Sequence, residues 1–319
     1  MRGREKMKRA KIFLRGIVLI TLMGLLFHFG QGIFDPQESL SLQRHSNQQP
    51  VFDLNDYQPV DDSSWNIQSR YALLVNRETG RVLYQRKANQ KMYPASLTKI
   101  MTVLVAIEQL EEEEMTVISD FTNLYESGAA LAGFFPGETV RAIDLLYGTM
   151  LSSGAEAAES LAQNISGSVD NFVALMNQKA RELGMNQTHF ENVTGLHDKG
   201  HYTTAKDLAI LLNDALSNER FKQIFTAIQY EMPSTTNHPS GLFMASRMFA
   251  KLNDVTFRGG QFLGGKTGYT EEAGLCLASL ASDGESEYIL VTAGAPGGPR
   301  TEQTNISDAI NLYERFFNE

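Results

Sequence analysis

Cysteine is nearly absent from this sequence, which contains a single one, Cys276, among 319 residues. No disulfide can therefore form within the chain. Cys276 lies in the alternating apolar run Leu275–Ala278, which predicts a small, buried residue of a β-strand. No histidine is close to it in the sequence, so we do not expect a catalytic cysteine at this position.

Positive charge and histidine are also scarce. The chain has a net charge of −9 and a pI of about 5.3, which argues against a nucleic-acid partner. Among the six histidines, His197 and His201 are four residues apart, but the Asp198–Gly200 segment between them predicts a turn rather than a helix. Because no third ligand has a suitable spacing, we expect no zinc site.

The first 34 residues combine a basic start with an apolar run. The first fifteen positions hold one acidic residue, Glu5, and seven basic residues: Arg2, Arg4, Lys6, Lys8, Arg9, Lys11 and Arg15. With the apolar run Ile17–Phe29, this layout predicts an export signal or an anchor that enters the cytoplasmic membrane through residues of about 16–33. The run is short for a full span, which favours a cleaved signal, whereas His28–Gly32 is a poor cleavage site and favours a retained anchor. In both cases the rest of the chain would lie outside the cytoplasmic membrane.

Residues 35–65 are polar and rich in Gln, Asp, Ser and Asn, which is typical of a linker, and residues 66–319 are expected to form the folded domain. Apolar patterns predict strands at both ends of this domain, around a helical insertion of about 105–230. The predicted strands are Tyr71–Val75, Arg81–Tyr84, Gly274–Ala281 and Tyr288–Ala293, and the predicted helices are Leu97–Leu110, Asp170–Leu183, Ala205–Leu216 and Ser307–Phe317. We therefore expect an α/β (α+β) fold with one antiparallel sheet built from both ends of the chain, helices on its faces and an inserted all-helical subdomain.

Two motifs that are far apart in the sequence carry the candidate chemistry. In Ser96–Lys99 a lysine follows a serine by three residues, so a helix would place both side chains on one face. The lysine amine can then take the hydroxyl proton and make the serine an acylating nucleophile. Lys266–Gly268, on a predicted strand about 170 residues further on, could bind an anionic substrate terminus. Serine acyl transfer is the chemistry that these residues indicate.

In this order and at this separation, the two motifs resemble those of the serine penicillin-recognising enzymes. Within that group the chain is most similar to the D-alanyl-D-alanine carboxypeptidases among the low-molecular-mass penicillin-binding proteins. The resemblance covers roughly residues 71–295, and it includes Tyr93–Thr102, Asn192–Leu196 and His201–Ala205. It implies a β-lactamase/transpeptidase-like fold.

The resemblance also implies roles for individual residues. Ser96 would attack the carbonyl between the two terminal D-alanines of a peptidoglycan stem peptide, Lys99 would be its base, and Ser153 would be the third catalytic residue. The substrate-binding residues would be Lys266, Thr267, Gly268 and Tyr269, the first two through the terminal carboxylate of the substrate. The backbone amides of Ser96 and Tyr269 would form the oxyanion hole. β-Lactam antibiotics would acylate the same serine, and no metal or other cofactor is implied.

The middle motif departs from the family pattern. Members usually have Ser-x-Asn, whereas this chain has Ser153-Gly154-Ala155. The alanine cannot hydrogen-bond a substrate amide or the lysine, and such a loss commonly costs about 1–3 kcal/mol when a buried partner is left unpaired. Glu156 or a water molecule could compensate; alternatively, Glu156 is an exposed residue in the first turn of a helix.

Two further functions stay open at this point. A serine β-lactamase of the same fold would use a glutamate in a Glu-x-x-Leu-Asn setting, but Glu191-Asn192 is followed by Val193-Thr194. A catalytically impaired, cell-wall-binding homologue is suggested by Ala155. With about twenty residues after Pro299, we expect no C-terminal β-rich module or membrane helix, so the N-terminal segment would anchor the protein at the outer face of the cell membrane or direct it to the cell wall.

Overall fold

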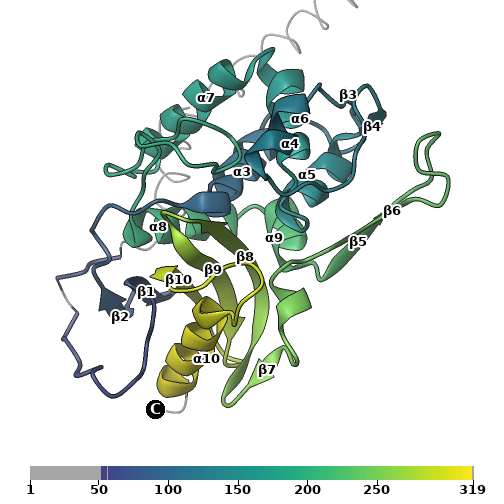
Figure 1. The fold of residues 1–319 in the computed structure, drawn as a ribbon. Coiled ribbons are helices and arrows are strands. Elements are labelled where there is room, and N and C mark those ends of the chain that lie inside the picture. Colours follow the sequence, from purple (N-terminus) through teal and green to yellow (C-terminus); the bar gives the residue numbers. More distant parts are fainter. Residues whose placement is uncertain (1–51, 56, 318–319) are drawn as a thin grey trace, which may run out of the picture. The chain divides into compact units, whose positions relative to one another are not determined.

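A six-stranded antiparallel sheet organises the protein, whose computed structural model describes residues 52–55 and 57–317 (Figure 1). Across the sheet the strands follow the order β2-β1-β10-β9-β8-β7. In chain order they are β1 (Tyr71–Asn76), β2 (Val82–Arg86), β7 (Thr256–Phe257), β8 (Gly260–Thr270), β9 (Gly274–Ser282) and β10 (Glu287–Ala295). The segments predicted as an anchor or signal, 1–34, and as its membrane contact, 16–33, lie outside the described residues.

The sheet joins the two ends of the folded chain. β1 pairs with β10 along its whole length, from Tyr71 opposite Ala293 to Asn76 opposite Tyr288. β2 extends this pair as a hairpin with β1, and β9 connects β10 to β8. The predictions of an N-terminal hairpin and of an antiparallel sheet built from both ends are confirmed.

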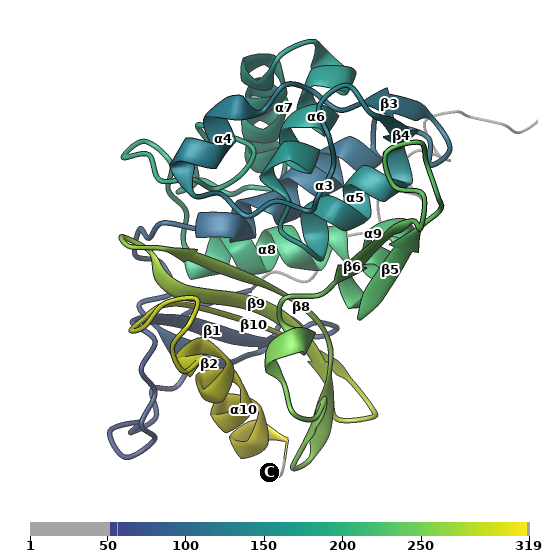
Figure 2. The same cartoon turned by 45° about the vertical axis from the view of Figure 1, so that its right-hand side comes forward.

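Both faces of the sheet are covered, as the alternating residues of β1 show. Leu73 and Val75 belong to the core shared with the helical part, whereas Ala72 and Leu74 pack in the core that contains residues of α10 (Thr304–Phe316). Figures 1 and 2 show α10 on one side of the sheet and helices α3 to α9 on the opposite side. Each large aliphatic side chain buried in this way contributes about 1.5–3 kcal/mol to folding, which explains the unbroken apolar runs of the central strands.

The helical part is inserted between β2 and β7. Its helices are η1 (Ala95–Thr98), α3 (Lys99–Ile107), α4 (Thr122–Ser127), α5 (Ala142–Met150), α6 (Ala155–Ser166), α7 (Val169–Glu182), α8 (Ala205–Ala215) and α9 (Glu219–Thr226), with η2 (Phe249–Lys251) nearer β7. Thr204 caps α8 by accepting a hydrogen bond from the Asp207 backbone N–H. None of the described helices has both the length and the hydrophobicity needed to cross a membrane.

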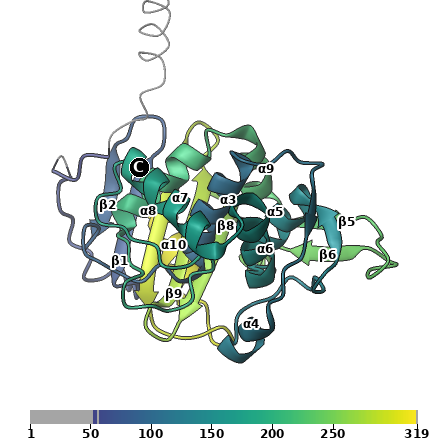
Figure 3. The same ribbon diagram turned by 90° about the horizontal axis from the view of Figure 1, so that it is seen from above.

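Two short ribbons accompany these helices. β3 (Met115–Val117) pairs with β4 (Thr139–Arg141), and β5 (Gln229–Met232) pairs with β6 (Leu242–Ala245). The first ribbon falls within residues 105–230, so the insertion that was expected to be all-helical also contains two short strands. Seen from above, the β5–β6 ribbon extends to one side of the helices (Figure 3).

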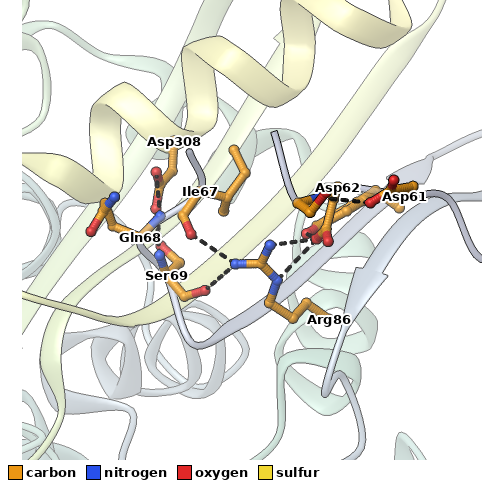
Figure 4. A network of polar contacts seen from close by, with 9 residues as sticks. Asp61, Asp62, Ile67, Gln68, Ser69, Arg86 and Asp308 are labelled. Carbon is orange, nitrogen blue, oxygen red and sulfur yellow. Dashed lines mark hydrogen bonds and ion pairs between the residues drawn. The ribbon is translucent and has the colours of Figure 1, made fainter. Parts of the chain in front are cut away.

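Residues 52–55 and 57–69, which precede β1, pack against the sheet and α10. Within the segment predicted as a linker, Phe52 is buried in the main core and Asp62 forms an ion pair with Arg86. The Arg86 guanidinium also donates to the Ile67 carbonyl at 2.8 Å (Figure 4). On the other side of the chain, Asp308 of α10 accepts a 2.6 Å hydrogen bond from the Ser69 backbone N–H. These contacts fix the entry of the chain into β1.

Candidate active site

The nucleophile motif lies where the helical part meets the sheet. Ser96 is in the short 3₁₀ turn η1, which lies against β8, and Lys99 begins α3. Ser96 faces a pocket of about 350 Å³ between the two parts. The predicted residues that line this pocket are Ser96, Lys99, Ser153, Thr267, Gly268 and Tyr269. The structure therefore brings both distant motifs and Ser153 to one cavity.

The backbone just before Ser96 is tightly constrained. Ala95 has a left-handed φ of 47°, a conformation that costs about 1–2 kcal/mol for a residue with a Cβ atom. A Cβ at Gly195 would lie 1.8 Å from the Ala95 carbonyl oxygen, and one at Gly268 would lie 3.1 Å from the Ser96 nitrogen. The two glycines let the backbones of these segments approach the turn, which explains their presence in the two motifs.

Lys99 is buried, with 2% of its surface exposed. Its Nζ donates a 2.6 Å hydrogen bond to the Thr194 carbonyl. The Asn192 side chain holds that carbonyl in place, because its Oδ1 accepts from the backbone N–H groups of Thr194 and Gly195 at 3.1 and 2.7 Å. Burial lowers the pKa of Lys99 to about 7, with the Glu156 carboxylate opposing the shift. At neutral pH a large fraction of this amine is therefore unprotonated and able to accept a proton.

Lys266 is the second buried amine of the site. Its Nζ donates to the Ser153 Oγ at 2.9 Å and to the Thr267 carbonyl at 2.8 Å. Burial lowers its pKa well below the usual range, and the neighbouring charges of Lys99 and Arg247 act in the same direction. Ser153 thus contacts the second of the two motif lysines. Because Ser153 Oγ accepts from Lys266, its own hydroxyl hydrogen is available to another acceptor.

Arg247 lines the same pocket and was not singled out from the sequence. It follows β6, and its backbone N–H donates to the Leu151 carbonyl at 3.2 Å. Burial lowers the pKa of its guanidinium below the ordinary value. The positive charge of this guanidinium attracts a carboxylate to the pocket. An arginine without a motif around it gives no sequence signal for such a role.

Glu156 is fully buried, so the interpretation of an exposed residue is wrong. Its Oε1 accepts from the backbone N–H groups of Ala132 and Gly133 at 2.6 and 2.8 Å, and from that of Phe134 at 3.4 Å. The neighbouring Ala155 N–H donates to the Ala130 carbonyl at 2.8 Å. The carboxylate thus holds the 130–134 loop, part of which lines the pocket, instead of taking the place of the missing asparagine.

The cysteine and the two histidines considered in the sequence analysis lie in packed, structural positions. Cys276 is buried in β9, as predicted, and burial raises the pKa of its thiol to about 12. His197 packs edge-on against Tyr93, with 4.7 Å between the ring centres. His201 is buried beside Thr98. Within residues 52–55 and 57–317, no three His, Cys, Asp or Glu side chains are grouped so that they could hold a metal ion.

Comparison with protein families identifies one family over most of the chain. The sequence profile of the D-alanyl-D-alanine carboxypeptidases (peptidase S11) matches residues 57–297. The chain is 35% identical over 254 residues to the D-alanyl-D-alanine carboxypeptidase DacF of Bacillus subtilis, covering 77% of this chain and 63% of DacF. It is 31% identical over 264 residues to DacC of Escherichia coli, covering 79% of this chain and 62% of DacC. The chain thus spans less than two thirds of the length of either relative.

Solved structures share the fold. A Streptomyces DD-transpeptidase superposes with a TM-score of 0.71 at 26% identity, over 82% of this chain and 100% of its own. A D-alanyl-D-alanine carboxypeptidase from Mycobacterium tuberculosis superposes with a TM-score of 0.69 at 25% identity, over 86% of this chain and 97% of its own. The predicted transpeptidase-like fold class is confirmed.

Proposed function

Since the chain belongs to the D-alanyl-D-alanine carboxypeptidase family, we propose that it is a serine D,D-carboxypeptidase that trims the terminal D-alanine from peptidoglycan stem peptides. The observation that carries the proposal is the buried Lys99 amine, one helical turn from Ser96, with a pKa lowered to about 7. An amine of this kind can act as a base at neutral pH. Because Ser96 lies in the 3₁₀ turn η1, in which residues three apart share a face, the amine is directed to the side of the serine.

In the first half-reaction, Ser96 Oγ bonds to the carbonyl carbon of the penultimate D-alanine while Lys99 takes its proton. The bond to the terminal D-alanine nitrogen then breaks. Lys99 passes the proton it received to that nitrogen, and Ser153, whose Oγ accepts a 2.9 Å hydrogen bond from Lys266, uses its own hydroxyl hydrogen to orient the leaving group. The amides of Ser96 and Tyr269 stabilise the oxyanion, a contribution worth about 10²–10³ in rate for one such donor.

In the second half-reaction, water attacks the carbonyl carbon of the acyl-Ser96 ester and Lys99 accepts a proton from it. The bond between that carbon and Ser96 Oγ then breaks, and Lys99 returns the proton to Ser96 Oγ.

Before the first step, the terminal carboxylate of the intact substrate binds to Thr267, Lys266 and the guanidinium of Arg247. The Arg247 guanidinium, which lines the pocket, attracts this negative charge, and the arrival of the carboxylate favours the protonated form of Lys266.

The two alternative functions differ in their support. A β-lactamase of the same fold would need a carboxylate beside the acyl group, but none of the described residues that line the pocket is acidic. Glu191 lies 3.2 Å from His189 instead. An impaired homologue is favoured by one observation, Ala155 in the pocket wall where the family has an asparagine. It would bind stem peptides without releasing D-alanine.

We also propose that the protein works at the outer face of the cell membrane or in the cell wall. The support is the sequence of residues 1–34, with its basic start and apolar run, together with a substrate class that is found outside the membrane. The 1–34 segment would be the export signal or the anchor.

Labelling with a fluorescent penicillin tests function and location together. We expect the purified protein to form a covalent adduct and Ser96→Ala to form none, because the β-lactam ring must be opened by the hydroxyl. On intact cells a membrane-impermeant penicillin should label the wild type to the same extent as in lysed cells. Equal labelling of Ser96→Ala would refute the nucleophile, and labelling only after lysis would refute the location.

A further inference from the structure

A chain of three hydrogen bonds ends at the residue before the nucleophile. Thr98 Oγ1 lies 2.9 Å from the Ala95 carbonyl oxygen and 2.8 Å from Nε2 of His201. The Glu191 backbone N–H donates to Nδ1 of the same imidazole at 3.2 Å. His201 and Thr98 are both buried. The function proposed above uses neither of these two side chains.

The direction of each bond follows from counting hydrogens. A backbone N–H can only donate, so Nδ1 of His201 is the acceptor and carries no hydrogen. Nε2 must then carry it and donate to Thr98 Oγ1. The single hydroxyl hydrogen of Thr98 is left to donate to the Ala95 carbonyl. The imidazole is therefore held as the neutral Nε2–H tautomer.

The acceptor of the last bond belongs to the peptide unit that contains the Ser96 N–H. A trans peptide is planar, so its carbonyl and its N–H point in opposite directions. No cis peptide occurs in the described chain. A bond that fixes the direction of the Ala95 carbonyl therefore also fixes the direction of the Ser96 N–H. Donation to the carbonyl also polarises the unit and strengthens its N–H as a donor.

The turn depends on such support because of its unusual backbone. Ala95 has a φ of 47°, and the Gly195 backbone lies so close to its carbonyl that a Cβ would come within 1.8 Å. Rotation of the Ala95–Ser96 peptide, which changes ψ of Ala95 and φ of Ser96, would turn the Ser96 N–H out of the pocket. The bond from Thr98 opposes that rotation.

We propose that His201 and Thr98 are positioning residues that orient the Ala95–Ser96 peptide so that the Ser96 N–H faces the oxyanion. This inference rests on the proposed acyl-transfer function of the same site. It gives the histidine of the His201–Ala205 segment a role that needs no metal and no contact with substrate.

The surroundings of His201 keep the proton arrangement constant over the working pH range. Burial lowers the pKa of the imidazole to about 4. The Asp198 carboxylate opposes this shift, whereas the charges of His189, His197 and Lys99 add to it. Nδ1 thus stays an acceptor at neutral pH. Phe190 packs edge-on against the ring at 5.6 Å between centres and excludes water from that side.

Three variants on one helical face test the proposal. Thr98→Val keeps the shape and removes the hydroxyl, and Thr98→Ser restores a donor. Thr102→Val is the matched control, because Thr102 lies one turn further along the helix than Thr98, is equally buried, and donates through its Oγ1 to the Val193 carbonyl at 2.7 Å. The readouts are the acylation rate constant and the noncovalent dissociation constant for a chromogenic penicillin, with thermal unfolding measured alongside.

We expect Thr98→Val to lower the acylation rate constant by about 10–100-fold, with the dissociation constant changed by less than about threefold, because a misdirected N–H fails chiefly in the transition state. Thr98→Ser should recover the rate to within about threefold, and Thr102→Val should keep it while losing similar thermal stability. Equal acylation rates for Thr98→Val and Thr102→Val would overturn the proposal.

The tautomer of His201 tests the hydrogen-bond chain without an activity measurement. Nitrogen-15 NMR of the wild-type protein should show a neutral imidazole with its hydrogen on Nε2 between about pH 5 and 8. A hydrogen on Nδ1, or a cationic ring at pH 7, would refute the hydrogen-bond chain even in an active enzyme. Failure of the wild type to react with any penicillin would instead refute the proposed function and leave this tautomer result standing.

Discussion

Lys99 lies at the start of α3 with its amine removed from water and bonded to the Thr194 carbonyl. Loss of hydration disfavours the ammonium form, and the opposing Glu156 carboxylate offsets only part of that cost. The same lysine on a solvated face of the helix would remain protonated at neutral pH and could not accept the proton of Ser96.

The pH dependence of acylation follows from this burial. The folded pKa of Lys99, about 7, lies below the ordinary value of 10.5, so the amine becomes neutral as the pH rises through about 7. We expect the acylation rate constant to increase with a midpoint near pH 7 and then to level off, since His201, at about 4, is already neutral. Stopped-flow measurement with a chromogenic penicillin between pH 5.5 and 9 checks this. A rate that is flat, or that falls as the pH rises, would contradict Lys99 as the base.

Among single residues, the sequence predicted those that belong to a motif with a fixed spacing. Ser96 and Lys99 are a helical turn apart, and Lys266–Gly268 is a motif, so both could be read directly. Arg247 reaches the pocket only through the packing of the segment after β6, and Glu156 is buried only because the 130–134 loop closes over it. Neither the position of Arg247 nor the burial of Glu156 produces a local pattern in the sequence.

At the level of helices, strands and loops, two short loops form part of the pocket wall, and each is fixed by one polar side chain. The Asn192 side chain organises the turn that presents the Thr194 carbonyl to Lys99. The Glu156 carboxylate gathers three backbone N–H groups of the 132–134 segment. Both devices replace regular secondary structure with side-chain acceptors for backbone donors.

Glu156→Ala should destabilise the protein and slow acylation. Three backbone N–H groups would lose a charged acceptor in a buried place, which costs about 1–3 kcal/mol and loosens the Gly128–Ala130 wall of the pocket. Glu156→Gln keeps a carbonyl acceptor and should lose less of both. Denaturant unfolding and penicillin acylation measure the two effects. Wild-type stability in Glu156→Ala would contradict the anchoring role.

Elements with a long periodic pattern were predictable. α7 (Val169–Glu182) and the predicted helix Asp170–Leu183 differ by one residue at each end, and β9 (Gly274–Ser282) contains the whole predicted strand. The turn η1 was read as part of one helix, because the left-handed Ala95 is set by its tertiary contacts with Gly195 rather than by its residue type. The ribbons β3–β4 and β5–β6 have strands of three and four residues, too short for alternation to identify.

The whole domain brings the site together from two parts of the chain. Ser96, Lys99 and Ser153 come from the helical insertion, whereas Lys266–Tyr269 come from β8 of the sheet. The pairing of β1 with β10 joins the N-terminal hairpin to the strands from the C-terminal part of the chain. The pattern of strands at both ends could predict this architecture, but the contact of η1 with β8 could be anticipated only from the family resemblance, because no local signal encodes a contact over about 170 residues.

The most direct test of this account is release of D-alanine from a stem peptide that ends in D-Ala-D-Ala. We predict that the wild-type protein releases one equivalent of D-alanine per peptide in repeated turnovers, and that Ser96→Ala releases none above background. Binding of the peptide without release would favour the impaired homologue suggested by Ala155. Release by Ser96→Ala would contradict the central claim that this serine, activated by Lys99, is the nucleophile.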